Sequence, residues 1–291
     1  MNEVITATII TVSTIGIVAA MILYLAAQKF KVYEDPRIDQ VEEVLPAANC
    51  GGCGYPGCRN FAESCVKAEN LDMLYCPVGG NATMAKVARA LGKEVEEKEK
   101  MIAVVKCNGA PKFRKNDNVY DGALNCTIAS NLYAGESACA YGCLGYGECA
   151  DACNFDALYI DPETKLPVVI EDKCTACNAC VEACPKDIIE LRPAGKRSKR
   201  IFVSCVSQDK TAVAKKACEA ACIGCSLCLK ACNYEAIKID NSLSYIDPFK
   251  CVMCRSCVSV CPTEAIWEVN FPLRKPKPAE KKPKPATQKE S

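Results

Sequence analysis

The sequence has 291 residues, of which 25 are cysteine and none is histidine, and its formal net charge is +1. The missing histidine excludes Cys2His2 zinc fingers, Rieske centres, histidine-ligated haem and histidine acid–base catalysis within the chain. The last 20 residues hold seven basic and two acidic side chains, which leaves the rest of the chain near −4. An acidic body of this kind argues against nucleic acid as a partner.

The first predicted element is an apolar helix near the N-terminus. Val4–Ala27 contains 24 residues without a charge, and as a helix this run would extend about 36 Å, enough to cross a bilayer. A cleaved signal peptide is the alternative, but it would need basic residues before a shorter apolar core, and only Glu3 precedes this one. The first basic residues follow the run, at Lys29, Lys31 and Arg37. The positive-inside rule therefore predicts a single-pass anchor over residues 1–28, with the rest of the chain in the cytosol.

A small cysteine-rich domain is predicted for residues 29–80. After a short connection over residues 34–46, four cysteines follow the pattern C-x2-C-x4-C with a more distant Cys-Pro, which can supply four thiolates to an iron–sulfur cluster. These are Cys50, Cys53, Cys58 and Cys76. Arg59–Glu69 is predicted to be a helix in which Cys65 is a small buried hydrophobe. A zinc site is the alternative for the four cysteines.

A repeated order of elements is predicted for residues 101–269. Before it, residues 81–106 should form a helical spacer over Asn81–Lys100, charged at its end, followed by a strand that ends at Cys107. A second strand ends at Cys205, and each of the two strands precedes a cysteine-rich unit. This repetition predicts a duplication.

The spacing C-x2-C-x2-C-x3-C, which wraps a cubane 4Fe-4S cluster, occurs three times without change. The copies are Cys174, Cys177, Cys180 and Cys184; Cys222, Cys225, Cys228 and Cys232; and Cys251, Cys254, Cys257 and Cys261. Disulfides explain this pattern poorly, because each run places its thiols around one shared metal core. Zinc ribbons use pairs of cysteines rather than triplets. The sequence therefore predicts iron–sulfur clusters.

A fourth copy of the run is altered. It consists of Cys139, Cys143, Cys149 and Cys153. Aligned without a gap on the second unit, it has Tyr146 in the place of Cys225, and Cys139 lies four residues before Cys143. We therefore predict that Cys139 binds the iron that lacks its middle ligand, and that the matching Cys218 is surplus. A three-iron or otherwise modified cluster is the alternative.

In two-cluster bacterial ferredoxins the last cysteine of each run binds the other cluster. Applied to both units, and together with the N-terminal domain, this rule predicts five 4Fe-4S clusters. Their ligand sets are Cys50, Cys53, Cys58 and Cys76; Cys139, Cys143, Cys149 and Cys184; Cys174, Cys177, Cys180 and Cys153; Cys222, Cys225, Cys228 and Cys261; and Cys251, Cys254, Cys257 and Cys232.

Five cysteines are left over. They are Cys65, Cys107, Cys126, Cys205 and Cys218. Four of them lie in the duplicated region and would suffice in number for a sixth cluster. Their spacing matches no known run, so buried free thiols are expected instead.

Two basic segments lie outside the cluster runs. The first, between the two units, consists of Lys196, Arg197, Lys199 and Arg200. It would steer an acidic electron-carrier protein to the nearest cluster, and a solvated loop is the alternative. The second is the tail, residues 272–291, which alternates Lys with Pro and should be disordered.

The sequence contains no flavin motif, no phosphate-binding glycine loop and no nucleophile paired with a base. The predicted cofactors are therefore 4Fe-4S clusters alone, without flavin, NAD or haem, and no substrate-converting site is expected in this chain. The expected fold class is α+β, with a single N-terminal transmembrane helix, the small 4Fe-4S domain and two tandem bacterial-type ferredoxin-like units. The units are assigned to residues 107–192 and 193–271, with two clusters in each.

The anchor, the segment AANCGGCGYPGC with its later Cys-Pro, the run CAYGCLGYGEC and the tandem ferredoxin units together resemble the B subunit of the Rnf complex over nearly the whole chain. That complex is an ion-translocating ferredoxin:NAD oxidoreductase. The resemblance implies an electron-transfer subunit at the bacterial cytoplasmic (inner) membrane, with its cluster domains on the cytoplasmic side. It implies reduced ferredoxin as the electron donor, with integral subunits that move sodium ions or protons and a separate flavin and iron–sulfur subunit that reduces NAD. The tandem units would then receive the electrons, and the cluster nearest the anchor would pass them on.

Two other functions stay open. One is a polyferredoxin subunit of a different membrane oxidoreductase, such as a hydrogenase. The other is a non-redox interaction module whose cysteines bind zinc.

Overall fold

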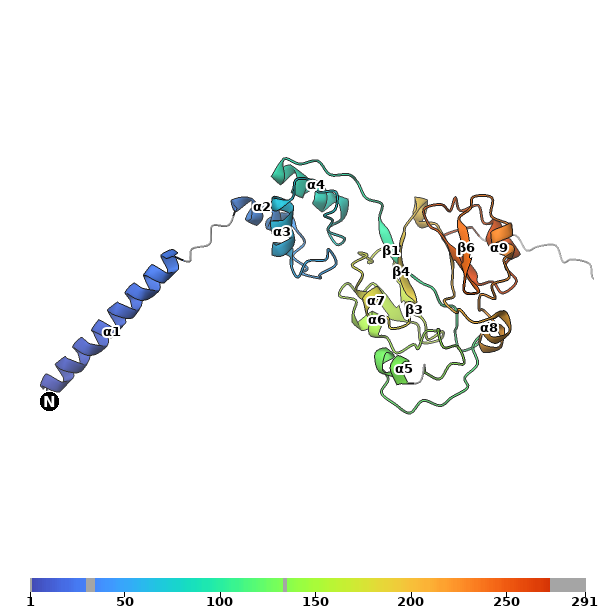
Figure 1. Cartoon of the computed structure of the whole chain (residues 1–291), viewed down its shortest axis with the longest axis horizontal. Helices are drawn as coiled ribbons and strands as arrows, with labels where there is room; N and C mark the ends of the chain where they lie inside the picture. Colours follow the sequence, from blue (N-terminus) through green and yellow to red (C-terminus); the bar gives the residue numbers. More distant parts are fainter. Residues whose placement is uncertain (1, 30–34, 133–134, 273–291) are drawn as a thin grey trace, which may run out of the picture.

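The computed structural model describes residues 2–29, 35–132 and 135–272, so the predicted disorder of the tail lies outside the described residues. Along the chain there is a long helix, a small helical domain and two units that combine short helices with two-stranded sheets (Figure 1). The long helix, α1, spans Asn2–Lys29, where the sequence predicts a helix. Within the described ranges, no helix has the length and apolarity that a membrane span requires.

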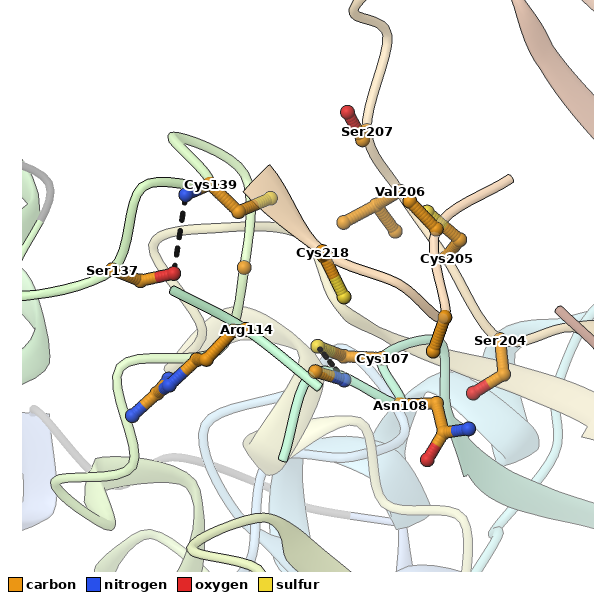
Figure 2. Close-up of a pocket in the computed structure, with 14 residues that line it drawn as sticks. Cys107, Asn108, Arg114, Ser137, Cys139, Ser204, Cys205, Val206, Ser207 and Cys218 are labelled. Atoms are coloured by element: carbon orange, nitrogen blue, oxygen red, sulfur yellow. Dashed lines mark hydrogen bonds between the residues drawn. The ribbon is translucent and has the colours of Figure 1, made fainter. Parts of the chain in front are cut away.

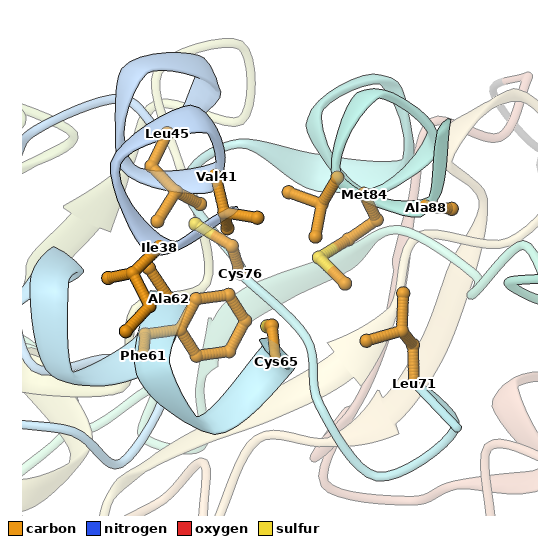
Figure 3. Packing of buried hydrophobic residues seen from close by; sticks show 11 residues of the cluster. Ile38, Val41, Leu45, Phe61, Ala62, Cys65, Leu71, Cys76, Met84 and Ala88 are labelled. Atoms are coloured by element: carbon orange, nitrogen blue, oxygen red, sulfur yellow. The ribbon is translucent and has the colours of Figure 1, made fainter. Parts of the chain in front are cut away.

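Three helices build the small N-terminal domain: α2 (Pro36–Val44), α3 (Cys58–Lys67) and α4 (Gly80–Leu91). Their apolar faces meet in a core that contains Val41, Phe61, Leu71 and Met84 (Figure 3). Burial of an apolar side chain of this size stabilises the fold by roughly 1.5–3 kcal/mol. This core holds the cysteine-rich loop that connects α2 to α3.

Two helix boundaries in this domain differ from the sequence prediction. The predicted connection over residues 34–46 contains α2, which the carboxylate of Asp35 caps by accepting from the Arg37 N–H at 2.9 Å. This helix is short and mostly polar, and so it gave little periodic signal. The predicted helix over Asn81–Lys100 ends early, because Gly92 adopts a φ of 63° and terminates α4 in the left-handed conformation.

Each of the two units contains two antiparallel strand pairs. In the first unit β1 (Met101–Val105) pairs with β4 (Ile189–Pro193), and β2 (Leu158–Ile160) pairs with β3 (Pro167–Val169). In the second unit β5 (Arg200–Val203) pairs with β8 (Ile266–Val269), and β6 (Ile237–Asp240) pairs with β7 (Leu243–Ile246). The strand before the cysteine runs thus pairs with the strand after them in both units, as the predicted duplication requires. β1 belongs to the sheet of the first unit, although the sequence prediction placed it in the spacer.

Short helices carry cysteines in both units. The first unit contains α5 (Cys126–Leu132), α6 (Glu148–Asp151) and α7 (Ala179–Glu182), and the second contains α8 (Thr211–Ala217), α9 (Leu227–Lys230) and α10 (Ser256–Val260), with the 3-10 turn η1 (Lys196–Ser198) between the units. In every run the third ligand position is the second residue of a helix: Cys149, Cys180, Cys228 and Cys257. The four runs therefore share one local fold.

Buried charged side chains join the two units. Arg200 of β5 is buried and forms an ion pair with Glu171 of the first unit. Arg192 of β4 is 2% exposed, and its guanidinium lies 5.0 Å from the centre of the Tyr245 ring. The Tyr245 hydroxyl donates to Glu190 at 3.0 Å. A buried charge is destabilising unless it is paired, so these contacts favour one arrangement of the two units.

Candidate iron–sulfur centres

Four cysteines of the second unit line one cavity. They are Cys232, Cys251, Cys254 and Cys257. Apolar side chains complete the wall, among them Ile201, Ile237 and Ile246. Cys232 belongs to the first run of this unit and the other three belong to the second run. The structure thus brings together the cysteines of one predicted set, including the exchanged one.

The first unit contains an equivalent cavity. Its cysteines are Cys153, Cys174, Cys177 and Cys180. Ala103, Leu158 and Leu191 from three strands add apolar surface to the wall. One cysteine again comes from the first run and three come from the second. Each cavity thus presents four thiols, the number that a 4Fe-4S cluster takes as ligands.

The backbone of all four runs has the same conformation. The second and fourth residues after the first cysteine have positive φ values between 56° and 92°. These residues are Gly145 and Gly147, Ala176 and Asn178, Gly224 and Ser226, and Met253 and Arg255. Left-handed residues set among right-handed ones turn backbone N–H groups toward one concavity, which favours the binding of an anionic cluster. The altered run keeps this loop shape although Tyr146 replaces its middle cysteine.

A cysteine outside the run, Cys126, lies near the altered copy. α5 begins at Cys126, and Thr127 donates through its N–H and its hydroxyl to Glu148 at 3.0 and 2.8 Å. These bonds place Cys126 beside Cys149. Burial raises the pKa of Cys149 to about 12, and the thiols of Cys184 and Cys126 are further causes of that rise. The structure therefore groups Cys126, Cys143, Cys149 and Cys184, and Cys107 also lies beside Cys143.

The structure differs from the sequence prediction at Cys139. This cysteine lies outside the group around the altered run and lines a separate cavity (Figure 2). The other cysteines of that cavity are Cys107, Cys205 and Cys218. The reason is the long segment before Cys139, which forms α5 and carries Cys126 to the run instead. The number of residues between Cys126 and the run matches no known ligand spacing, so the sequence offered no signal for Cys126.

The remaining set of the second unit surrounds the run that begins at Cys222. Burial raises the pKa of Cys228, and the thiols of Cys222 and Cys225 add to the rise. The Cys228 Sγ lies 3.2 Å from the Ser244 hydroxyl of β7. Cys261, the predicted exchanged ligand, packs against the same hydrophobic cluster as Cys222 and Cys228.

The four predicted ligands of the N-terminal domain also lie near one another: Cys50, Cys53, Cys58 and Cys76. Burial raises the pKa of Cys76, and the other three thiols raise it further. The Gly79 N–H donates to the Cys76 Sγ at 3.4 Å, and Asn49 closes the loop by accepting from the Cys58 N–H at 2.8 Å. Cys65 is fully buried in the three-helix core, as predicted for a small hydrophobe (Figure 3).

The N-terminal domain contacts the first unit through the loop that carries its cysteines. A Cβ atom on Gly52 would lie 2.8 Å from the carbonyl oxygen of Cys177 and 3.0 Å from its Cβ. Only glycine permits so close an approach of the two backbones. Cys53 and Cys174 also line one shared surface pocket. The N-terminal set and the set that contains Cys177 are therefore adjacent.

The predicted docking segment is only partly accessible. Lys196 and Arg197 are exposed, whereas Lys199 is half-buried and lies 5.2 Å from the centre of the Phe271 ring. Arg200 is buried and paired with Glu171, so it is not available to a partner. The alternation along β5 turns this side chain toward the first unit.

Each iron of a cubane takes one thiolate, so the sulfur atoms of a set surround a cluster and do not meet at one ion. In the part of the chain that the structure describes, no three Cys, Asp or Glu side chains are arranged to hold a single metal ion.

Three protein-family models match the chain. A model described as a putative Fe-S cluster matches residues 45–78, which contain the N-terminal set. Two models described as 4Fe-4S dicluster domains match residues 140–191 and 221–265. The chain therefore contains two ferredoxin-type domains of mixed helix and strand, and iron–sulfur clusters are the cofactors of such domains.

Curated relatives match most of the chain. The B subunit of the Na+-translocating ferredoxin:NAD+ oxidoreductase complex of Acetobacterium woodii is 41% identical over 86% of this chain and 74% of its own length. The B subunit of the ion-translocating oxidoreductase complex of Methanosarcina acetivorans is 38% identical over 91% of this chain and 99% of its own length. The B subunit of the proton-translocating ferredoxin:NAD+ oxidoreductase complex of Clostridium ljungdahlii is 37% identical over 89% and 90%. With this identity over most of the chain and of each relative, the chain belongs to the B subunit family of the Rnf complexes.

Proposed function

We propose that this chain passes single electrons from reduced ferredoxin to the membrane subunits of an ion-translocating ferredoxin:NAD oxidoreductase. Two relatives are named as subunits of ferredoxin:NAD+ oxidoreductase complexes, and the matched domains are of the 4Fe-4S type. Bound clusters would supply one-electron redox chemistry at potentials set by burial and hydrogen bonding. The observation that carries the proposal is that two four-cysteine cavities each draw on both runs of one unit, as in two-cluster ferredoxins.

Five ligand sets follow from this proposal, with Cys126 in the place first assigned to Cys139. They are Cys50, Cys53, Cys58 and Cys76; Cys126, Cys143, Cys149 and Cys184; Cys153, Cys174, Cys177 and Cys180; Cys222, Cys225, Cys228 and Cys261; and Cys232, Cys251, Cys254 and Cys257. Besides the thiolates, the backbone of each run contributes N–H groups that stabilise negative charge on a cluster.

The contacts between ligand sets support a path for electrons along the chain. Within the first unit, the Cys180 thiol is one of the neighbours that raise the pKa of Cys149, so its two sets are close. The set that contains Cys177 then adjoins the N-terminal domain at Gly52. In the proposed path, electrons enter at the second unit, cross the first unit and leave from the N-terminal domain.

The Rnf complex is a membrane-bound complex, and we propose that α1 anchors this subunit in the bacterial cytoplasmic membrane as a single pass. The uncharged run over Val4–Ala27 supports this, as do the large apolar side chains that α1 exposes, such as Ile15 and Leu23, each 69% exposed. Basic residues after the run place the cluster domains on the cytoplasmic side. The proposed partners are reduced ferredoxin, the integral subunits that move sodium ions or protons, and a flavin and iron–sulfur subunit that reduces NAD.

Membrane vesicles test the proposal. Vesicles from cells that contain this chain should reduce NAD+ with reduced ferredoxin, and vesicles from cells that lack it should not. Supplying the chain again should restore the activity, as should a Cys65→Ser variant, because Cys65 lies in an apolar core. If deletion instead abolished hydrogen-dependent electron transfer and spared NAD+ reduction, the chain would be a polyferredoxin subunit of a hydrogenase.

A further inference from the structure

Four cysteines outside the five sets surround one space where the two units meet (Figure 2). They are Cys107, Cys139, Cys205 and Cys218. The first two come from the first unit and the other two from the second. Cys107 and Cys218 are each 7% exposed. The segment after Cys107 pairs with the second unit here, because the Asn108 N–H donates to the Ser204 carbonyl at 3.2 Å and the Glu219 N–H donates to the Phe113 carbonyl at 2.8 Å.

The four cysteines occupy matching positions in the duplication. Cys107 lies two residues after the end of β1, and Cys205 lies two residues after the end of β5. Cys139 lies four residues before Cys143, and Cys218 lies four residues before Cys222. Each unit therefore contributes the same two cysteines to one shared site.

Backbone N–H groups near the thiols repeat in the same way. The Gly109 N–H donates to the Cys107 Sγ at 3.4 Å, and the backbone of Cys143 lies beside the same thiol. The backbones of Ser207 and Cys222 lie beside the Cys205 thiol. Backbone N–H donors of this kind stabilise a thiolate and a cluster bound to it. They also show that Cys107 adjoins the altered run and that Cys205 adjoins the run that begins at Cys222.

Glycines leave room at the site. A Cβ atom on Gly109 would lie 3.4 Å from the Cys107 Sγ and 3.9 Å from the Cys218 Sγ. One on Gly142 would lie 3.6 Å from the Cys139 Sγ. Four cysteines line this cavity, as four cysteines line each of the two cavities within the units. Its set of possible ligands thus matches in number those of the proposed cluster sites within the units.

Polar atoms at the cavity lack partners among the described residues. Arg114 donates through Nη1 to the Cys143 carbonyl at 2.7 Å, but its buried Nε has no acceptor within that part of the chain. The hydroxyl of Ser204, a residue only 1% exposed, likewise has none there. Buried donors without acceptors are unfavourable. A bound group that carries negative charge would satisfy them, and the Arg114 charge would offset the charge of a thiolate-ligated cluster.

We propose that Cys107, Cys139, Cys205 and Cys218 bind a sixth 4Fe-4S cluster, which bridges the two units. This inference rests on the proposed electron relay and extends it. One electron arrives from a reduced cluster of the second unit, which is thereby oxidised, and leaves to an oxidised cluster of the first unit, which is thereby reduced. In this proposal the sixth cluster lies between the set that contains Cys222 and the set that contains Cys143.

Iron and acid-labile sulfide per chain test the sixth site on the full chain, purified and reconstituted without oxygen. Six clusters predict about 24 iron and 24 sulfide atoms, and five predict about 20. Cys107→Ser and Cys205→Ser should each remove about four iron atoms, and the double variant should lose the same four and not eight. Cys65→Ser is the matched control, since it also replaces a buried thiol, and it should lose none.

Several results would overturn the sixth site. They are a wild-type chain with about 20 iron atoms, iron that is unchanged in both variants, or about one zinc ion per chain that disappears in them. If either variant failed to fold, two measurements would still decide whether the sixth site exists. They are the iron content of Cys139→Ala, a change at the half-buried rim of the cavity, and the iron content of the wild-type chain. A chain with five redox-active clusters would refute the sixth site alone, whereas a chain without redox-active iron would refute the proposed relay itself.

Discussion

The two ferredoxin-type units reach four thiolates around their first run by different routes. In the second unit the middle ligand position of the run is Cys225, whereas in the first unit Tyr146 occupies it. The first unit has the longer segment before its run, and that segment contains α5 and Cys126. Both loops nevertheless share the same left-handed residues. In the proposed assignment, the shape of the loop is kept in both units, and Cys126 supplies the first unit with a ligand from elsewhere in the chain.

The largest effect should come from removal of the middle ligand in either unit. Cys126→Ser in the first unit and Cys225→Ser in the second should each lose about four iron atoms, or about one if a three-iron cluster remains. Iron analysis measures the loss, and low-temperature EPR identifies a three-iron product. Cys139→Ser should spare the cluster of the altered run, because Cys139 lies in another cavity. Loss of the altered-run cluster in Cys139→Ser, with no loss in Cys126→Ser, would restore the assignment made from the sequence.

A rescue experiment sharpens the comparison further. Tyr146 occupies the position of Cys225, in a loop of the same conformation. Adding Tyr146→Cys to Cys126→Ser should therefore restore about four iron atoms per chain. Tyr146→Ser in the same background is the control and should restore none. If Tyr146→Cys also failed, the two loops would not be equivalent in shape.

A smaller effect, on stability, should be equal in the two units. A Cβ atom on Gly145 would lie 2.8 Å from the Lys165 carbonyl oxygen, and one on Gly224 would lie 2.6 Å from the Ser242 carbonyl oxygen. Both glycines also have positive φ, at 82° and 61°. Each Gly→Ala change should lower the free energy of unfolding by about 1–3 kcal/mol, since strain and a backbone clash combine. Anaerobic thermal unfolding measures the change.

Gly54 provides the control for that experiment. Its φ is 84°, but an added Cβ would meet nothing within 4 Å. Gly54→Ala should therefore show the conformational cost alone, about 1–2 kcal/mol. If Gly54→Ala lowered the free energy of unfolding as much as Gly145→Ala and Gly224→Ala do, the close contacts with the Lys165 and Ser242 carbonyl oxygens would contribute nothing.

The smallest effect concerns the docking of ferredoxin at the basic segment that lies between the two units. Lys196→Glu combined with Arg197→Glu should slow association with reduced ferredoxin about tenfold at low salt, and less at high salt, because the steering is electrostatic. Stopped-flow kinetics at two ionic strengths measure the change. Lys215→Glu with Lys216→Glu, on exposed positions of α8, changes the net charge by the same amount. Equal effects of both pairs would indicate a dependence on net charge without a docking site.

The sequence predicted the cysteine sets that follow a regular spacing and could not predict those that depend on tertiary structure. The exchange of Cys153 and Cys232 followed from the ferredoxin rule, and both cysteines line the expected cavities. Cys126 reaches its position through α5 and the bonds of Thr127 to Glu148, which no spacing encodes. The cavity around Cys139 forms only where the two units pack together.

Charge was equally difficult to interpret from the sequence. Lys196 and Arg200 belong to one basic stretch, yet one is exposed and the other is buried against Glu171. The difference arises because Arg200 begins β5 and faces the neighbouring unit. The strands that end near Cys107 and Cys205 could be predicted from their apolar segments, but their pairing across each unit required the structure.

The reaction of the oxidised chain with reduced ferredoxin tests the central claim most directly. Anaerobic mixing, followed by rapid freezing and EPR, should show paramagnetic reduced 4Fe-4S clusters in this chain and matching oxidation of ferredoxin, one electron for each cluster reduced. A colourless chain that leaves ferredoxin reduced, with zinc in place of iron, would contradict the account.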